Sequence, residues 1–174
     1  MADMSPEAVT QRLRLMDELW ELSVKLMNSG NKHASEGRND SPPKSGLVTA
    51  QTELVVGVAR VIGSLSPVNS ISVAFEDDGE TGYLYALDFG QESPMLDAMH
   101  IYNVDNVLDR DTPSVVEFQW SGDGLKLAFL INGHVHAVFD FAAERGYCRT
   151  GFPPNVDWSK EGHDWNEAAL SFFE

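Results

Sequence analysis

The chain has 174 residues and a formal net charge of −15, and 43% of its residues are hydrophobic. This hydrophobic content excludes a globally disordered chain, and the length suits one domain with a small appendage. The acidic balance disfavours nucleic acid as a ligand, because binding it depends on neutralising phosphates with Lys and Arg.

Compartment and partner class follow from the same composition. No apolar run approaches the roughly 20 residues of a membrane-spanning helix, and the N-terminus lacks the basic and apolar regions of a secretory signal. The single Cys148 excludes an intramolecular disulfide framework. We therefore expect a cytoplasmic protein that does not contact a membrane. An acidic surface suits a basic protein partner, although acidity also serves solubility alone.

Residues 1–29 are predicted to form an amphipathic N-terminal helix, which begins at residue 5. Ser5 is a natural N-cap and Pro6 suits the first helical position. Apolar residues recur at spacings of three and four in two adjacent stripes, so the helix must pack on the domain or on a second copy. Residues 30–46 follow as a flexible linker, because Gly, Ser, Asn and Pro dominate there.

From residue 47 to residue 174 the pattern predicts a domain rich in antiparallel β-strands. The content of Val and Ile favours a strand over residues 53–64, which Gly57 interrupts. Alternating apolar residues predict a strand, an acidic turn and a second strand over residues 71–87. Residues 95–104 are expected to form a short helix that runs into a strand.

The clearest β signal lies between residues 114 and 141. Apolar alternation, a Gly-containing turn at 121–124 and the hairpin pair Asn132-Gly133 predict a three-stranded meander. Residues 146–158 read as a loop that leads into a final helix over 160–174, with a capping-box pattern. The expected class is α+β: an antiparallel sheet of about five to seven strands, a C-terminal helix and a tethered N-terminal helix.

The acidic stretch FEDDGETGYLYALD, residues 75–88, is the first candidate site. Its spacing does not fit an EF-hand loop, and consecutive acids at a turn usually all face water, which disfavours acid/base catalysis. We interpret it as a negatively charged hairpin tip that grips a basic partner, or else as a soluble turn. The candidate partner-binding residues are Glu76, Asp77, Asp78, Glu80, Tyr83 and Tyr85.

The HVH segment is a second candidate. On a regular strand, His134, His136 and Asp140 would share one face and could form part of a cupin-type metal site, with His100 as a further ligand. The alternative is the polar, solvated face of a half-buried strand, and we favour it. We therefore assign neither a metal nor another cofactor.

Nucleophilic catalysis finds little support in the sequence. Arg145 and Arg149 flank Cys148 and could lower its pKa, but a base would have to come from a distant histidine such as His163. No Ser lies in a G-x-S-x-G elbow, and Gly-rich phosphate loops are absent. A buried structural cysteine is the favoured interpretation.

The segments FEDDGETGYLYALD, LDAMHIYNVDNVLDRD, WSGDGLKLAFLINGHVHAVFDF and RGYCRTGFPP resemble a bacterial family of domains of unknown function. The resemblance covers roughly residues 50–155. It implies a short cytoplasmic protein and an association with the immunity (antitoxin) partners of delivered toxins, and the family supplies no catalytic residues.

Three functions remain open from the sequence. The first is a non-enzymatic, acidic protein-binding module, in its most specific form an immunity protein that neutralises a basic toxin. The second is a metal-dependent or small-ligand enzyme that uses His134, His136 and Asp140. The third is a structural or regulatory homodimer held by residues 5–29.

Overall fold

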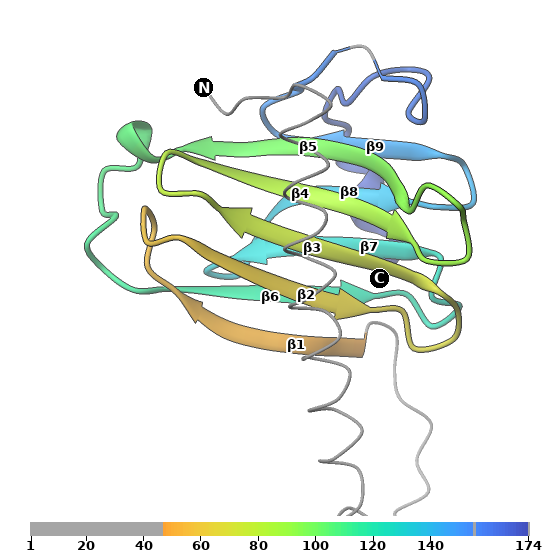
Figure 1. The fold of residues 1–174 in the computed structure, drawn as a ribbon, viewed down its shortest axis with the longest axis horizontal. Helices are drawn as coiled ribbons and strands as arrows, with labels where there is room; N and C mark the ends of the chain where they lie inside the picture. The colour runs from red at the N-terminus through yellow and green to blue at the C-terminus, as the bar shows by residue number, and fades with distance from the viewer. Residues whose placement is uncertain (1–46, 155, 174) are drawn as a thin grey trace, which may run out of the picture. The chain divides into compact units, whose positions relative to one another are not determined.

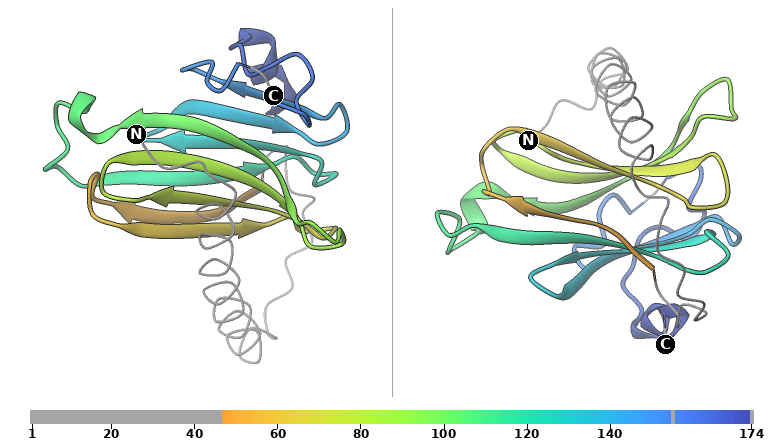
Figure 2. Two further views of the ribbon diagram at one scale, coloured as in Figure 1. Left: turned by 45° about the horizontal axis from the view of Figure 1, so that its top comes forward. Right: turned by 90° about the horizontal axis from the view of Figure 1, so that it is seen from below.

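Two antiparallel β-sheets pack face to face in the described part of the chain. The computed structural model describes residues 47–154 and 156–173, so the predictions for the helix at 1–29 and the linker at 30–46 lie outside the described residues. One sheet has five strands in the order β1-β6-β7-β8-β9, and the other has four in the order β2-β3-β4-β5 (Figure 1). Figure 2 shows the two layers obliquely and from below. The strands are β1 (Leu47–Leu54), β2 (Arg60–Leu65), β3 (Ile71–Asp77), β4 (Thr81–Asp88), β5 (Met95–Asn103), β6 (Ser114–Trp120), β7 (Lys126–Ile131), β8 (His134–Asp140) and β9 (Arg145–Cys148).

The core lies between the sheets and is strongly aromatic. Phe75 of the four-stranded sheet stacks on Phe129 of the five-stranded sheet, with ring centroids 4.9 Å apart. Trp120 is fully buried, and its indole N–H donates a hydrogen bond of 2.9 Å to Ser64 Oγ across the sandwich. These contacts join both sheets into one hydrophobic core, as burial of the two inner faces requires.

The expected α+β class is wrong for the described residues, which form a mostly β structure. The helix expected over 160–174 is a 3₁₀ helix, η2 (Glu167–Phe173), and a second 3₁₀ turn, η1 (Val104–Asn106), follows β5. Ala169, Phe172 and Phe173 of η2 pack on the outer face of the five-stranded sheet. The segment is therefore held by burial on a sheet, because so short a helix has little intrinsic stability.

The strand expected over 53–64 is two strands in two different sheets. Gly57 has a φ of 87°, a value that favours glycine, and it lies in the turn between β1 and β2. The chain thus crosses from one sheet to the other at this point. A single apolar run in the sequence hid this division between the two sheets.

Of the remaining predictions for the strands and loops, two are confirmed and two are wrong. The hairpin over 71–87 is confirmed as β3 and β4, and the meander over 114–141 is confirmed as β6, β7 and β8. The helix expected at the start of 95–104 is wrong, since β5 is extended throughout. The loop expected over 146–158 is wrong at its start, where β9 pairs with β8.

Candidate functional site

Asp77 is the centre of one end of the sandwich. Its side chain is 1% exposed and accepts hydrogen bonds from Gly57 N–H (2.8 Å), Gly79 N–H (2.8 Å) and the Tyr102 hydroxyl (2.6 Å). These donors come from the β1–β2 turn, the β3–β4 turn and β5. The expectation that every acid of this stretch faces water is therefore wrong for Asp77, which joins three segments.

Tyr102 completes this junction. Its ring lies over Gly82, where an added Cβ would come within 2.7 Å of the ring. Burial, and then the neighbouring Asp77 carboxylate, raise the pKa of Tyr102 well above its ordinary value. The phenol therefore stays protonated at neutral pH and serves as a hydrogen-bond donor to Asp77.

Asp78 shapes the hairpin turn that follows. Its Oδ1 accepts hydrogen bonds from the backbone N–H groups of Glu80 (2.9 Å) and Thr81 (2.7 Å). This is the local side-chain-to-backbone pattern that makes Asp frequent in turns. The neighbouring Glu80 side chain is exposed, and its carbonyl accepts a hydrogen bond from Val104 N–H, which ties the turn to η1.

The two tyrosines expected to flank an exposed tip are buried. Tyr83 is 6% exposed and Tyr85 is 1% exposed, and their rings stack with centroids 6.2 Å apart. The Tyr85 hydroxyl donates to Glu76 Oε2 at 2.9 Å. The structure therefore brings Glu76 and the two tyrosines together on one face of the sheet, and it sets them apart from the wet end of the hairpin.

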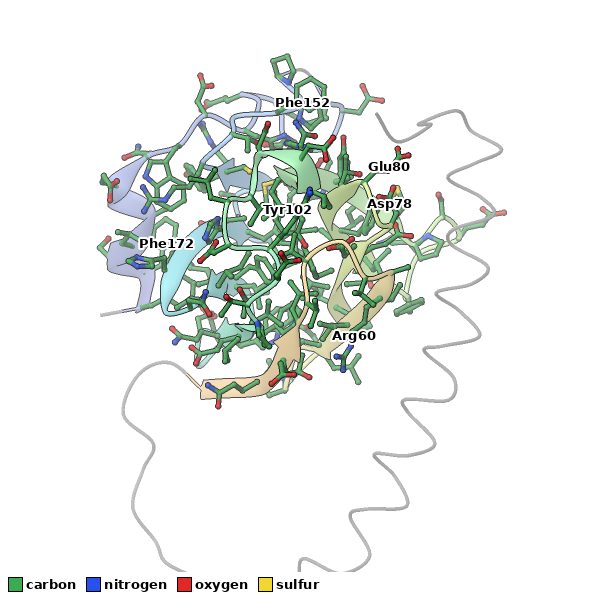
Figure 3. All side chains as sticks on the ribbon, turned by 90° about the vertical axis from the view of Figure 1, so that its left-hand side faces the viewer. Arg60, Asp78, Glu80, Tyr102, Phe152 and Phe172 are labelled. Carbon is green, nitrogen blue, oxygen red and sulfur yellow. The ribbon has the colours of Figure 1, made fainter. Side chains whose placement is uncertain are left out.

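The exposed surface at the Asp77 end is acidic and carries two apolar side chains. Figure 3 looks onto this end, where Asp78 and Glu80 lie close to Tyr102. Leu108 is fully exposed at 101%, and Val58 is 58% exposed. We define the acidic loop end as the exposed or half-exposed charged residues and the exposed large apolar residues of the β1–β2, β3–β4 and β5–β6 connections, together with Arg60 at the start of β2: Val58, Arg60, Asp78, Glu80, Asp105, Leu108, Asp109, Arg110 and Asp111.

The residues of the suggested metal site do not converge. The register of β7 and β8 shifts between Phe129 and Leu130, so His136 lies in a β-bulge and the regular alternation is broken. Asp140 is buried, and its Oδ1 accepts hydrogen bonds from the N–H groups of Ala142 and Ala143. Across residues 47–154 and 156–173, no cluster of three or more His, Cys, Asp or Glu side chains is arranged to hold a metal ion.

His100 also lies apart from the HVH segment. It belongs to β5 in the four-stranded sheet, its ring packs edge-on against Tyr83, and its Nε2 lies 3.0 Å from Asn103 Oδ1. The partial burial of His136 lowers its pKa, and the nearby Arg149 and His134 add to this shift. His136 is therefore mostly neutral at neutral pH.

Cys148 is a buried structural cysteine. Its Sγ lies 2.9 Å from the carbonyl oxygen of His100, and burial raises its pKa. The flanking arginines do not activate it, because Arg149 stacks on Trp165 at 4.1 Å and Arg145 pairs with Glu161. A thiol with a raised pKa inside the core is a poor nucleophile.

Asp97 and His163 form a buried pair of ionisable residues that was not predicted from the sequence. His163 is completely buried, with Nε2 at 2.7 Å from Asp97 Oδ2 and Nδ1 at 2.7 Å from the carbonyl oxygen of Pro153. Both ring nitrogens thus meet oxygen atoms and none faces an opening, so the pair has the geometry of a structural link. The one signal in the sequence was that Asp97 alternates with the apolar, inward-facing Met99 and Ile101 of β5.

The chain is similar to known bacterial proteins. Among the described residues, no helix has the length and apolarity needed to cross a membrane. Residues 54–174 match the family described as "Uncharacterized protein conserved in bacteria (DUF2251)". An uncharacterised protein of Haemophilus influenzae is 43% identical over 119 residues, which are 66% of this chain and 74% of the relative. No solved structure matches the chain at a comparable level of significance. The family match covers most of the chain, and the chain therefore belongs to the DUF2251 family of uncharacterised bacterial proteins.

Proposed function

We propose that this protein is a non-enzymatic binding module that recognises a basic protein through the acidic loop end. The supporting observation is the junction at Asp77, where one buried carboxylate holds two turns and β5 at the same end of the sandwich. Loops fixed on a rigid β-scaffold are a common way to build a recognition surface.

Charge and apolar exposure on the acidic loop end support a protein as the ligand. The exposed carboxylates of Glu80, Asp109 and Asp111 would attract a basic surface and speed the encounter, as the net charge of −15 also would. Leu108, fully exposed among them, would supply the apolar contact that charges alone do not give. A toxin neutralised by an immunity protein is the most specific form of this proposal, and the toxin would be the basic partner.

The site proposed from the sequence changes at the buried residues Asp77, Tyr83 and Tyr85. Because Tyr83 and Tyr85 are buried, the apolar contribution to binding is assigned to Leu108 and Val58. Asp77 acts as a positioning residue that a partner does not touch. Asp78 and Glu80 keep their proposed role as contact residues.

The experiment is affinity capture from the native bacterial host with the full chain, followed by mass spectrometry and a salt titration. We expect a basic protein whose retention falls as salt rises. The variant Glu80→Lys/Asp109→Lys should release it. The control, Glu92→Lys/Glu144→Lys, makes the same change in net charge at exposed positions outside the acidic loop end and should retain it.

Two outcomes would contradict the proposal. One is a captured protein that both lysine variants release equally, because net charge alone would then explain the binding. The other is retention that does not respond to salt and survives Leu108→Ser as well as the Glu80→Lys/Asp109→Lys change. Either result would place recognition on another surface of the protein.

A further inference from the structure

The edge strands on the two sides of the sandwich differ in whether another segment of the chain covers them. On one side, β5 and β9 are covered by the C-terminal segment: His100 N–H donates to the carbonyl of Phe152 (3.0 Å), and Cys148 N–H donates to the carbonyl of His163 (2.9 Å). On the opposite side, β1 and β2 end their sheets, and within the described residues no strand pairs with β2 beyond β3 (Figure 1). An open edge strand offers a row of hydrogen-bonding groups to another strand.

The register shows which groups of β2 point outward. Ser66, just past β2, donates its N–H to the carbonyl of Ile71 at 2.9 Å. The backbone N–H and C=O groups of the even-numbered residues in this segment therefore point toward β3. Successive residues of a strand direct their backbone groups to opposite sides. Val61, Gly63 and Leu65 therefore direct their N–H and C=O groups away from β3, at the open edge.

This edge carries few of the features that prevent edge-to-edge pairing. The segment VIGSL (61–65) contains no proline and no charged side chain, and its register with β3 has no bulge. Arg60 at the start of β2 is the one charged residue of that strand. Natural edges are usually protected by charges, prolines or bulges, and their absence here makes β2 a suitable template for another strand.

We propose that β2 pairs with β2 of a second copy of this chain, antiparallel and around a two-fold axis at Gly63. Val61 then lies opposite Leu65 of the second copy, and Leu65 opposite Val61 of the second copy. The outward groups of the two strands form about six hydrogen bonds, and the Val and Leu side chains meet at about 5.5 Å between Cβ atoms. The two four-stranded sheets become one continuous sheet.

Local charge favours a second copy over a basic strand as the occupant. The edge has no carboxylate that would attract a basic strand, and in the proposed pairing Arg60 lies opposite Ser66 of the second copy, so no like charges meet. The net charge of −15 opposes association at low salt, but charges more than about 8 Å apart are largely screened at physiological ionic strength. An interface this small gives a weak dimer, which depends on protein concentration.

The test measures the mass of the full chain by sedimentation equilibrium from about 10 μM to about 1 mM, at physiological salt. We expect the mass to rise with concentration from the 19.2 kDa of one chain toward twice that value. Hydrogen exchange of the Val61, Gly63 and Leu65 amides should slow over the same range. A mass that stays at one chain throughout would overturn the proposal.

Two charge variants test the register. Val61→Lys/Leu65→Lys places like charges opposite each other in both pairs and should weaken dimerisation at least about tenfold. Val61→Lys/Leu65→Glu places opposite charges in the same two pairs and should preserve it, with folding of both variants checked by circular dichroism. A dimer that both variants leave unchanged, as one held by residues 5–29 would be, overturns the proposal. Equal loss in both folded variants would overturn the register.

Discussion

His163 and Asp97 form a buried pair in which Nε2 of the imidazole lies 2.7 Å from Oδ2 of the carboxylate. The two side chains are 0% and 1% exposed. Nδ1 meets the carbonyl of Pro153, which can only accept, so Nδ1 carries a proton. The contact with Asp97 then needs a second proton, either on Nε2 or on the carboxyl group. The hydrogen bond that this proton makes joins the C-terminal segment to β5.

Breaking the pair should destabilise the fold strongly. Asp97→Ala and His163→Ala each leave a buried polar group without its matched partner, so each should cost about 3 kcal/mol of unfolding free energy. The double variant should cost less than the sum of the two, with a coupling energy of about 1–3 kcal/mol. Urea unfolding measures all four proteins.

Asp157→Asn is the control, because Asp157 is exposed in the same C-terminal segment. It should change stability by less than about 0.5 kcal/mol. Additive effects of the Asp97 and His163 substitutions would show that the two side chains do not interact, contrary to the geometry described above.

Gly146 should tolerate no side chain, because His163 lies against it. A Cβ at this position would stand 2.8 Å from His163 Cδ2 and 2.9 Å from Met99 Sδ. Gly146→Ala should therefore cost about 1–3 kcal/mol through displacement of the packed side chains. Gly122→Ala is the matched control, since its Cβ would have no atom within 4 Å and should be neutral or slightly stabilising. Thermal unfolding of both variants tests the prediction. Equal melting temperatures would contradict it.

The Asp77 junction should be more sensitive to loss of the carboxylate than to loss of the tyrosine hydroxyl. Asp77→Asn presents an amide N–H₂ where a second acceptor is needed, and should cost about 3 kcal/mol. Tyr102→Phe removes one donor and leaves the two backbone donors in place, so it should cost about 1–2 kcal/mol. Urea unfolding measures both.

A local readout separates the junction from general stability. In Asp77→Asn the amides of Gly57 and Gly79 should exchange with solvent at least about tenfold faster than in the wild type, because their acceptor is weakened. The amide of Gly146 at the far side of the core is the reference. Unchanged exchange at Gly57 and Gly79 would show that Asp77 does not hold these turns.

The sequence predicted the parts of the fold that depend on local signals. The Asn132-Gly133 pair, with φ values of 50° and 78°, forms the turn between β7 and β8 that its composition indicates. The division of residues 53–64 between two sheets was not predictable from periodicity, because both strands are apolar and only Gly57 separates them. The final helix was overestimated since a capping pattern indicates a helix start and says nothing about its length.

The candidate site was only partly predictable, because its organisation depends on long-range contacts. Asp77 and Asp78 are identical residues next to each other in the sequence, yet Asp77 is buried and Asp78 shapes a turn. The difference arises from Gly57, 20 residues before Asp77, and Tyr102, 25 residues after it. In the same way, a β-bulge at His136 broke the face that regular alternation assigned to His134, His136 and Asp140.

His136 should make stability depend on pH in the acidic range. Its folded-state pKa lies below the ordinary value of 6.5, first through burial and then through Arg149 and His134. The unfolded chain therefore binds a proton at this residue more readily than the folded chain does. The stability that a neutral His136 contributes is present above pH 6.5 and is lost as the pH falls below it.

Urea unfolding from pH 7.5 to pH 5.5 measures this effect. The wild type should lose stability over that range, and His136→Gln should lose less, because glutamine does not titrate and the buried position no longer opposes a charge. His134→Gln is the control: it removes an exposed histidine that raises the cost of charging His136, so its pH dependence should be slightly weaker than that of the wild type and stronger than that of His136→Gln. An identical slope in the wild type and His136→Gln would mean that His136 titrates equally in both states, and that its burial does not oppose protonation.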